Sequence, residues 1–286
     1  MSEEEFEVAG GLKSEAGAQG PGDHAEPSGS PPVNGGSGGL KSEAGAQGPG
    51  DHAEPSGSPP VNNATGPVDE PRVVQVGRDE ALWDGLLEVG GEVIARGGVI
   101  VLPTDTVYGV GCDPFNSSAV DALFAVKRRG RDLPLPVLVH GWRQAIGLVE
   151  DFSEQAKTLA AAWWPGPLTI VLREAAGIGW DLGDSRGTVA VRMPKQSFAL
   201  ALIRRTGPLA VTSANRSGEP TRPTVAGIVE QLGDDVDVFF DAGPAPGGEP
   251  STIVDLTSSR PRLLRAGAIP AEEIERTLGE PLSDGA

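Results

Sequence analysis

Apolar residues recur at regular spacing only in the last three quarters of the chain. Within 79–96, Leu82, Leu86 and Ile94 follow the period of an amphipathic helix, which a Gly-Gly pair ends. An uninterrupted apolar run over 99–102 comes next and predicts a buried strand. Helical and extended patterns then continue to the end of the chain, which is typical of an α/β domain.

Further elements are predicted by the same periodicity. Strands are expected over 136–139, 168–173, 188–193, 209–212, 236–240, 251–256 and 262–264. Helices are expected over 152–162, 197–206, 224–232 and 271–278, and from a cap at Asn116 or Ser117 to Lys127. Because several strands follow one another without an intervening helix, we expect an open, twisted and mixed sheet with flanking helices.

The first 71 residues lack this periodicity. They are rich in Gly, Pro, Ala, Ser and Glu, and the stretch 10–34 is repeated without change at 38–62. Each copy holds one Leu and one Val, too few for repeats that stack through an apolar face. Such a composition buries too little surface to offset chain entropy. The sequence therefore predicts a disordered tail over 1–71 and one compact domain over 72–286.

The net charge of the chain limits the kinds of molecule that we expect it to bind. The formal net charge is -17, and the chain beyond the acidic tail still carries 28 acidic against 21 basic residues. The run Lys127, Arg128, Arg129 and Arg131 stands out from this background. It suits a focused anion pocket better than a broad nucleic-acid surface, although a solvated helix end would also explain the run taken alone.

The composition gives little support for a metal site, a disulfide or a membrane segment. One cysteine and three histidines predict no disulfide and no metal held by protein side chains, and leave Mg²⁺ as a companion of a bound nucleotide. No apolar run approaches eighteen residues, and the acidic stretch 1–7 differs from a signal peptide. A cytoplasmic protein without a membrane partner is expected.

Hydrogen-bonding side chains gather where predicted strands end. Thr106 lies in the segment 103–111 after a buried strand, Arg192 ends another strand, and Ser213 and Asn215 follow a third. Ordinary explanations exist for each, namely a turn with glycines at positive φ, a surface ion pair and a plain strand-to-loop turn. Strand ends are also where α/β sheets bind ligands, so these loops are candidates for one shared site.

Six segments, taken in order, resemble the YrdC-like threonylcarbamoyl-adenylate synthase family. The resemblance extends over 73–278, and four positions depart from it. Leu133 and Leu138 stand where many members carry Asn and His, Gly130 replaces a common Pro, and Pro250 replaces a common Glu. The six segments are 103–109, 127–135, 188–194, 212–218, 250–255 and 264–269.

The resemblance implies a sheet with a large concave cavity and an enzyme of the nucleotidyltransferase class. Members of the family condense L-threonine, bicarbonate and ATP into threonylcarbamoyl-AMP and pyrophosphate. The product serves the threonylcarbamoyladenosine modification of tRNA. ATP, with Mg²⁺, is then a substrate, and tRNA or the proteins that transfer the group to tRNA are partners.

The resemblance also assigns roles to residues. Thr106 and Arg192 would hold threonine, and Lys127 and Arg129 would be the catalytic residues. No covalent nucleophile is required and none is assigned. The nucleotide would be held by Lys127, Arg129, Thr188, Ser213, Asn215, Thr221 and Ser251.

Two other functions are compatible with such a basic concavity. A non-catalytic module for double-stranded RNA would need a broader basic surface, which the acidic domain and its few aromatic residues disfavour. A carbamoyl-transfer enzyme with another acceptor would be expected to add zinc-finger segments, and one cysteine cannot form them.

Overall fold

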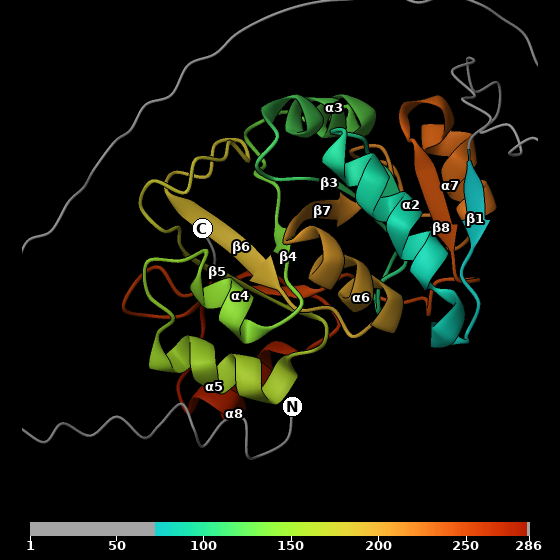
Figure 1. Cartoon of the computed structure of the whole chain (residues 1–286). Coiled ribbons are helices and arrows are strands. Elements are labelled where there is room, and N and C mark those ends of the chain that lie inside the picture. The colour runs from blue at the N-terminus through green and yellow to red at the C-terminus, as the bar shows by residue number, and fades with distance from the viewer. Residues whose placement is uncertain (1–71, 285–286) are drawn as a thin grey trace, which may run out of the picture. The chain divides into compact units, whose positions relative to one another are not determined.

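A computed structural model describes residues 72–284 of the chain (Figure 1). The predicted tail and its repeat lie outside the described residues. The described part forms one sheet of eleven strands in the order β1-β8-β2-β3-β7-β4-β6-β5-β9-β10-β11. Parallel and antiparallel neighbours alternate irregularly across it, so the predicted mixed sheet is confirmed.

Most strands lie within two residues of their predicted positions. Their bounds are β1 Val73–Gln75, β2 Ile100–Leu102, β3 Gly109–Cys112, β4 Val137–Leu138, β5 Leu168–Arg173, β6 Thr188–Arg192, β7 Leu209–Ser213, β8 Val238–Asp241, β9 Thr252–Asp255, β10 Arg262–Arg265 and β11 Ser283–Asp284.

Several helices begin at polar side-chain caps. Asn116 accepts a hydrogen bond from the backbone N–H of Ala119, so the predicted cap is confirmed, and Thr224 caps the helix that follows it in the same way. The bounds are α2 Asp84–Ala95, α3 Ser117–Lys127, α4 Trp142–Ile146, α5 Glu154–Trp163, α6 Ser197–Thr206, α7 Val225–Leu232 and α8 Ala271–Leu278, with 3-10 turns at Glu80–Leu82 and Gly233–Asp235.

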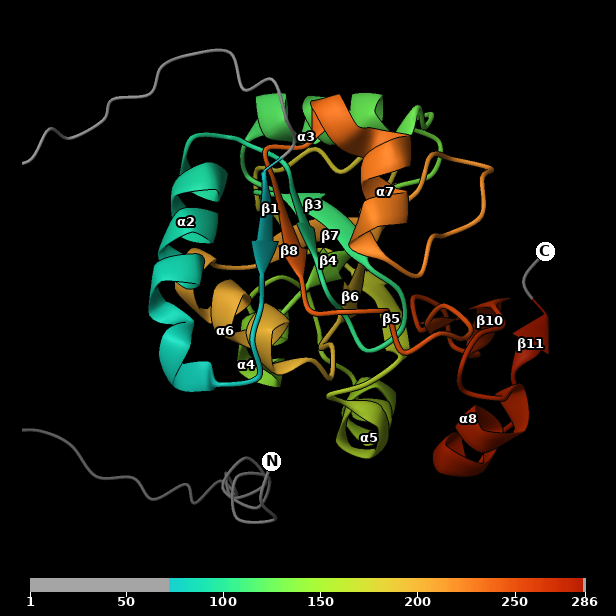
Figure 2. The same ribbon diagram turned by 90° about the vertical axis from the view of Figure 1, so that its right-hand side faces the viewer.

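Helices pack on both faces of the sheet. Figure 2 shows α2 and α6 side by side on one face, where Phe198 and Leu202 pack on Phe240. The other face carries a larger core with side chains from α3, α5, α7 and α8, among them Leu123 and Leu159. Because strand residues alternate between faces, β2, β4, β7 and β8 each supply side chains to both cores.

The face under α2 and α6 continues past these helices onto β4, β6 and β5. Leu138 of β4 is the register partner of Arg192 on one side and of Leu209 on the other, so the three side chains share this face. Val211 lies on the same face, two residues beyond Leu209. The apolar packing therefore ends beside an arginine, and this is where the pocket described below begins.

The segment 103–111 differs from the prediction. Its last residues form strand β3, and neither Gly109 nor Gly111 adopts positive φ. A Cβ on Gly109 would lie 2.5 Å from Cγ1 of Val211, and one on Gly111 would lie 2.6 Å from the carbonyl oxygen of Ala210. These glycines thus permit the close approach of β3 to β7 and are not turn residues.

Candidate active site

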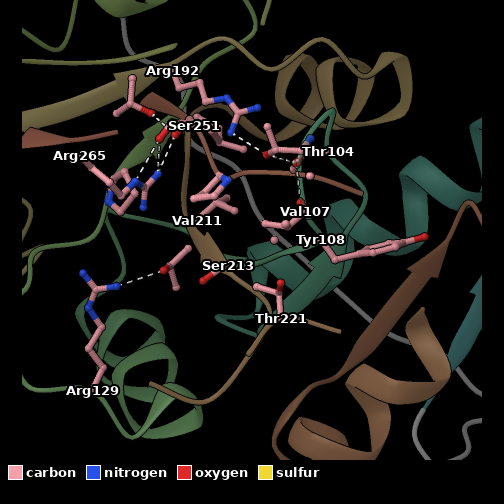
Figure 3. A pocket seen from close by; sticks show the side chains of 18 residues that line it. Thr104, Val107, Tyr108, Arg129, Arg192, Val211, Ser213, Thr221, Ser251 and Arg265 are labelled. Atoms are coloured by element: carbon pink, nitrogen blue, oxygen red, sulfur yellow. Dashed lines mark hydrogen bonds between the residues drawn. The ribbon is translucent and has the colours of Figure 1, made fainter. Parts of the chain in front are cut away.

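A cavity of about 260 Å³ opens on this face of the sheet (Figure 3). It brings together three arginines, several hydroxyl side chains and an apolar wall that includes Leu138 and Val211. Residues from eight strands or the loops that follow them contribute to it, so only the folded sheet assembles it. The predicted site residues that line the cavity are Thr106, Arg129, Arg192, Ser213, Thr221 and Ser251.

Arg192 lies at the end of β6 with its side chain only 8% exposed. Its Nε donates to the carbonyl oxygen of Gly166 at 3.0 Å and its Nη1 to Oγ1 of Thr106 at 3.1 Å. Its Nη2 forms an ion pair with Oδ1 of Asp105 at 2.8 Å. Three of the five guanidinium N–H groups are engaged in these bonds, which leaves two for a ligand in the cavity.

Arg129 is held by the turn that follows α3. Arg128 ends the helix in the left-handed conformation, with φ at 48°, and this reverses the chain direction. The Arg129 side chain then donates from Nε to the carbonyl oxygen of Leu133 at 2.9 Å and from Nη1 to Oγ1 of Thr212 at 3.1 Å. A cation is thereby fixed between the turn and the end of β7.

Arg265 is a third pocket arginine, which our sequence reasoning did not assign to the site. It ends β10, and its Nη2 donates to the backbone oxygen of Ser251 at 2.7 Å and to the hydroxyl of Ser251 at 2.9 Å (Figure 3). That hydroxyl also lies 2.7 Å from Oγ1 of Thr169. The available signal was an arginine at a strand end inside a motif, the same signal that identified Arg192.

The three arginines lie close enough to affect one another. Burial lowers the pKa of Arg192 and of Arg129, and the pKa of Arg265 is lowered by burial and then by the charges of Arg192 and Arg129. All three stay charged, because the ordinary pKa of arginine is so high. Among residues 72–284, Asp105 is the one carboxylate that forms an ion pair with any of them. The cavity therefore favours an anionic ligand.

Lys127 lies behind the cavity and does not line it. Only 2% of the residue is exposed, and its ammonium group donates to the carbonyl oxygen of Ser213 at 2.5 Å, to the carbonyl oxygen of Asn215, and to Oδ1 of Asn215 at 3.2 Å. Its backbone oxygen accepts from the N–H of Ser217 at 2.8 Å. Burial, and then the charge of Arg129, lowers its pKa to about 8.

Two other predicted nucleotide ligands also lie outside the cavity lining. Asn215 is buried, and its amide nitrogen donates to the carbonyl oxygens of Arg216 and Glu219, so it braces the loop after β7. Thr188 lies at the start of β6, where its hydroxyl donates to the carbonyl oxygen of Ser185 at 2.7 Å. It shares the face of Arg192, four residues along the strand.

The remaining cations of the basic run point elsewhere. Arg131 pairs with Asp121 at 2.7 Å and with Asp181 at 2.5 Å, and its guanidinium carbon lies 4.9 Å from the centre of the Phe124 ring. Arg128 is exposed. Neither residue lines the cavity.

Leu133 and Leu138, the two leucines that depart from the family pattern, occupy different places. Leu138 is buried and forms part of the cavity wall, whereas the side chain of Leu133 is half exposed. Leu133 contributes only its backbone oxygen, which receives Arg129. Neither side chain offers a polar contact to a ligand.

Tyr108 ties a further loop to the pocket. Its hydroxyl donates to the carbonyl oxygen of Gly243 at 2.6 Å and accepts from the N–H of Ala242 at 3.0 Å. Burial raises the pKa of this phenol to about 12, so it stays protonated at neutral pH. The loop it holds supplies Gly248 and Pro250 to the cavity lining.

Within residues 72–284, no three His, Cys, Asp or Glu side chains are grouped as a metal ion would require. In the same part of the chain, no helix has the length and apolar character needed to cross a membrane.

Comparison with known proteins agrees with this geometry. A family model for Sua5, YciO and YrdC proteins, described as telomere recombination, matches residues 92–267. That match spans more than half of the chain, and the chain belongs to this family.

Relatives named as threonylcarbamoyl-AMP synthases are similar to this chain over most of the described residues. A putative threonylcarbamoyl-AMP synthase of Mycobacterium tuberculosis is 49% identical over 186 residues, which are 65% of this chain and 86% of that protein. The threonylcarbamoyl-AMP synthase of Pyrococcus abyssi is 36% identical over 202 residues, 70% of this chain and 59% of the longer relative. The crystal structure of P. abyssi Sua5 complexed with L-threonine matches with a TM-score of 0.68 and 34% identity, over 74% of this chain and 61% of that one.

Proposed function

We propose that this chain is an L-threonylcarbamoyladenylate synthase, with residues 72–286 as its catalytic domain. It condenses L-threonine, bicarbonate and ATP into threonylcarbamoyl-AMP and pyrophosphate. The observation that carries the proposal is the convergence of Arg129, Arg192 and Arg265 with hydroxyl donors in one cavity of a family member. The names of the relatives, threonylcarbamoyl-AMP synthase, support the same reaction.

The chemistry needs positioning and charge neutralisation more than a nucleophilic side chain. The amine of threonine combines with bicarbonate to form a carbamate and water. A carbamate oxygen then attacks the α-phosphorus of ATP, and the bond from that phosphorus to the bridging oxygen breaks, so that pyrophosphate leaves. Fixed arginines suit this step, because negative charge is spread over the phosphate oxygens in the transition state.

The residues divide between the two substrates. Arg192 receives the carboxylate of threonine through its remaining N–H groups, beside the hydroxyl of Thr106. Arg129 and Arg265, with the hydroxyl groups of Ser213, Thr221 and Ser251, bind the phosphates. The apolar wall at Leu138 and Val211 is left for the threonine methyl group.

The nucleotide extends beyond the cavity. A volume of about 260 Å³ is small for a nucleotide site, since ligand cavities usually measure about 300–1,000 Å³. The cavity therefore receives the reacting groups, and the adenosine reaches along the same sheet face towards Thr188. Lys127 and Asn215 serve the nucleotide by ordering the loop that carries Ser213.

The companion ion and the partners follow from the reaction. Mg²⁺ enters as part of the substrate Mg-ATP, held mainly by phosphate oxygens as is usual for this ion. The product passes to the proteins that modify tRNA, and we place the enzyme with its substrates in the cytoplasm. The alternative of an RNA-binding module would need a broad basic surface, whereas the arginines here converge in one cavity.

Pyrophosphate release tests the proposal. The purified chain is incubated with Mg-ATP, bicarbonate and L-threonine, with matched reactions that omit threonine or bicarbonate. We expect release only when all substrates are present, together with a product of the mass of threonylcarbamoyl-AMP. Release that does not depend on threonine, or no release, would reject the synthase function.

A further inference from the structure

The Asp105 carboxylate has no place in the chemistry above, although it is the closest acidic group to a substrate-binding arginine. Its side chain is 12% exposed and pairs with Arg192, which is 8% exposed. Asp105 is absent from the cavity lining, so it meets Arg192 from outside the cavity. Among the described residues, its ion pair with Arg192 is its side-chain contact with the cavity lining.

The carboxylate itself is fixed by the backbone. Oδ1 of Asp105 accepts from Nη2 of Arg192 at 2.8 Å and from the backbone N–H of Lys195 at 2.8 Å. The neighbouring residue, Thr106, bonds to Nη1 of the same guanidinium. Two consecutive residues of one loop thus accept hydrogen bonds from both terminal nitrogens, while the Gly166 carbonyl oxygen accepts one from Nε.

An unrestrained Arg192 would not keep this orientation. Arg265 and Arg129 are near enough for their charges to be felt within the cavity, and like charges in a partly buried site repel. Asp105 opposes that repulsion with the one ion pair that any cavity arginine forms in the described part of the chain. It holds the planar guanidinium in one orientation, in which two of its N–H groups have no partner within residues 72–284.

We infer that Asp105 is a positioning residue for threonine binding, acting through Arg192. The inference rests on the proposed function. It distinguishes Asp105 from a general base, because Asp105 does not line the cavity and its carboxylate contacts Arg192 and the backbone N–H of Lys195. The ligand that benefits is the carboxylate of an amino acid, since a pre-oriented guanidinium binds a carboxylate through two parallel hydrogen bonds.

The test compares Asp105→Asn with a matched control. Asn keeps the size of the side chain and removes its charge. We expect the KM for threonine to rise about tenfold or more, the order expected when a hydrogen bond to a charged group is lost, with the KM for ATP within about twofold. A merely structural role would lower the active fraction and hence kcat, and would leave the KM for threonine unchanged.

Asp237→Asn is the control, because this carboxylate also binds an arginine and a backbone amide. It accepts from Arg96 at 2.9 Å and from the N–H of Val99 at 2.8 Å, away from the cavity lining. Both KM values should stay at wild-type levels. If Asp105→Asn does not fold, Asp105→Glu keeps the charge, displaces it by one methylene and should still raise the KM for threonine.

A double-mutant cycle shows whether the effect passes through the arginine. In an Arg192→Lys background, which already binds threonine weakly, Asp105→Asn should change the KM for threonine by less than about twofold. An effect of undiminished size there, or a loss of kcat with unchanged KM in the single variant, would overturn the inference.

Failure of the proposed function is visible separately. It would appear as a wild-type chain without threonine-dependent pyrophosphate release. Calorimetric titration of threonine into wild type and Asp105→Asn then tests the positioning role without turnover. Equal affinities in the two proteins would reject it.

Discussion

The inner and outer cations of the run 127–131 lie within five residues and have opposite environments. Lys127 is buried with its ammonium group bonded to the loop after β7, and Arg129 reaches the cavity. Arg128 and Arg131 face outward, and Arg131 is neutralised by two surface carboxylates. The charge of a residue in this run therefore says little about its role.

The difference arises from how α3 ends. Its last turn carries Lys127 on the inner side, and the left-handed conformation of Arg128 reverses the chain and sends Arg129 inward again. A regular helix would have separated these two residues by about 200° around its axis. Local backbone geometry thus turns a plain basic run into one buried cation, one cation that lines the cavity and two surface cations.

The largest expected effect separates Arg129 from its neighbour. Arg129→Ala removes a fixed cation from the phosphate site and should lower kcat/KM by about a hundredfold to a thousandfold, the range seen when one transition-state donor is lost. Arg128→Asn removes the neighbouring charge, and Asn tolerates the left-handed conformation, so this control should stay within about twofold. Steady-state kinetics with ATP as the varied substrate measure kcat/KM for both variants. Equal losses would mean that overall charge, and not position, matters.

Lys127→Met tests the inner lysine. It removes the ammonium donor from the carbonyl oxygens of Asn215 and Ser213, of which Ser213 keeps the backbone N–H of Asn215. We therefore expect a loss of about 1–3 kcal/mol in the free energy of unfolding and a fall in kcat of about tenfold to a hundredfold. Denaturant unfolding and kinetics measure the two effects. Lys157→Met, which removes an exposed lysine paired with Glu154, should alter neither. Unchanged kcat in Lys127→Met would show that the loop orders itself without the ammonium group.

The pH dependence of kcat gives a smaller and more specific test of the same residue. The pKa of Lys127 is about 8 in the folded chain and 10.5 ordinarily, so the folded chain loses this proton first. The ammonium form, with three donors, persists below about pH 8, and kcat should fall as pH rises through 8. The contribution of this group to stability changes in the opposite direction and rises with pH between 8 and 10.5, because the unfolded chain then binds more protons.

Lys127→Arg is the variant that checks the assignment. Its guanidinium stays charged, so the decline of kcat near pH 8 should disappear, whatever the residual rate. Rates measured from pH 6.5 to 9.5 are sufficient. A decline that persists in Lys127→Arg would belong to another group.

The smallest effect is expected at the outer arginine. Arg131→Ala breaks two exposed ion pairs and a contact with the ring of Phe124. Exposed pairs of this kind contribute about 0–1 kcal/mol each, so the melting temperature should fall slightly while kcat/KM stays within about twofold. A large loss of activity would place Arg131 with the inner cations and remove the contrast on which these predictions rest.

Elements with strong periodicity were predicted well, and elements without it were missed. The helices predicted over 197–206 and 271–278 have the same bounds as α6 and α8. Strand β3 was interpreted as a turn, because its glycines carry no apolar period and their purpose is the close packing of Val211. The short helix α4 and the edge strand β1 lie in segments too brief for a periodic signal.

The loops that form the site were identified from the sequence. Which of their residues line the cavity and which bind other protein groups was not. Thr106, Arg129, Arg192, Ser213, Thr221 and Ser251 line the cavity, as a shared site at strand ends requires. The assignment of Lys127 and Asn215 as direct ligands was made without knowing that each has partners behind the cavity. Arg265 was passed over because it is distant in sequence from the other cations.

By itself, the sequence determined the mixed α/β class, the acidic balance, the absence of thiol clusters and the loops that carry chemistry. These depend on residue type and local spacing, which are visible along one dimension. Only the tertiary structure decided which cations line the cavity and which bind the protein, because donors separated by up to about 160 residues share one cavity. The pairing of Asp105 with Arg192 is of that kind, since it joins two strand ends that meet only in the folded sheet.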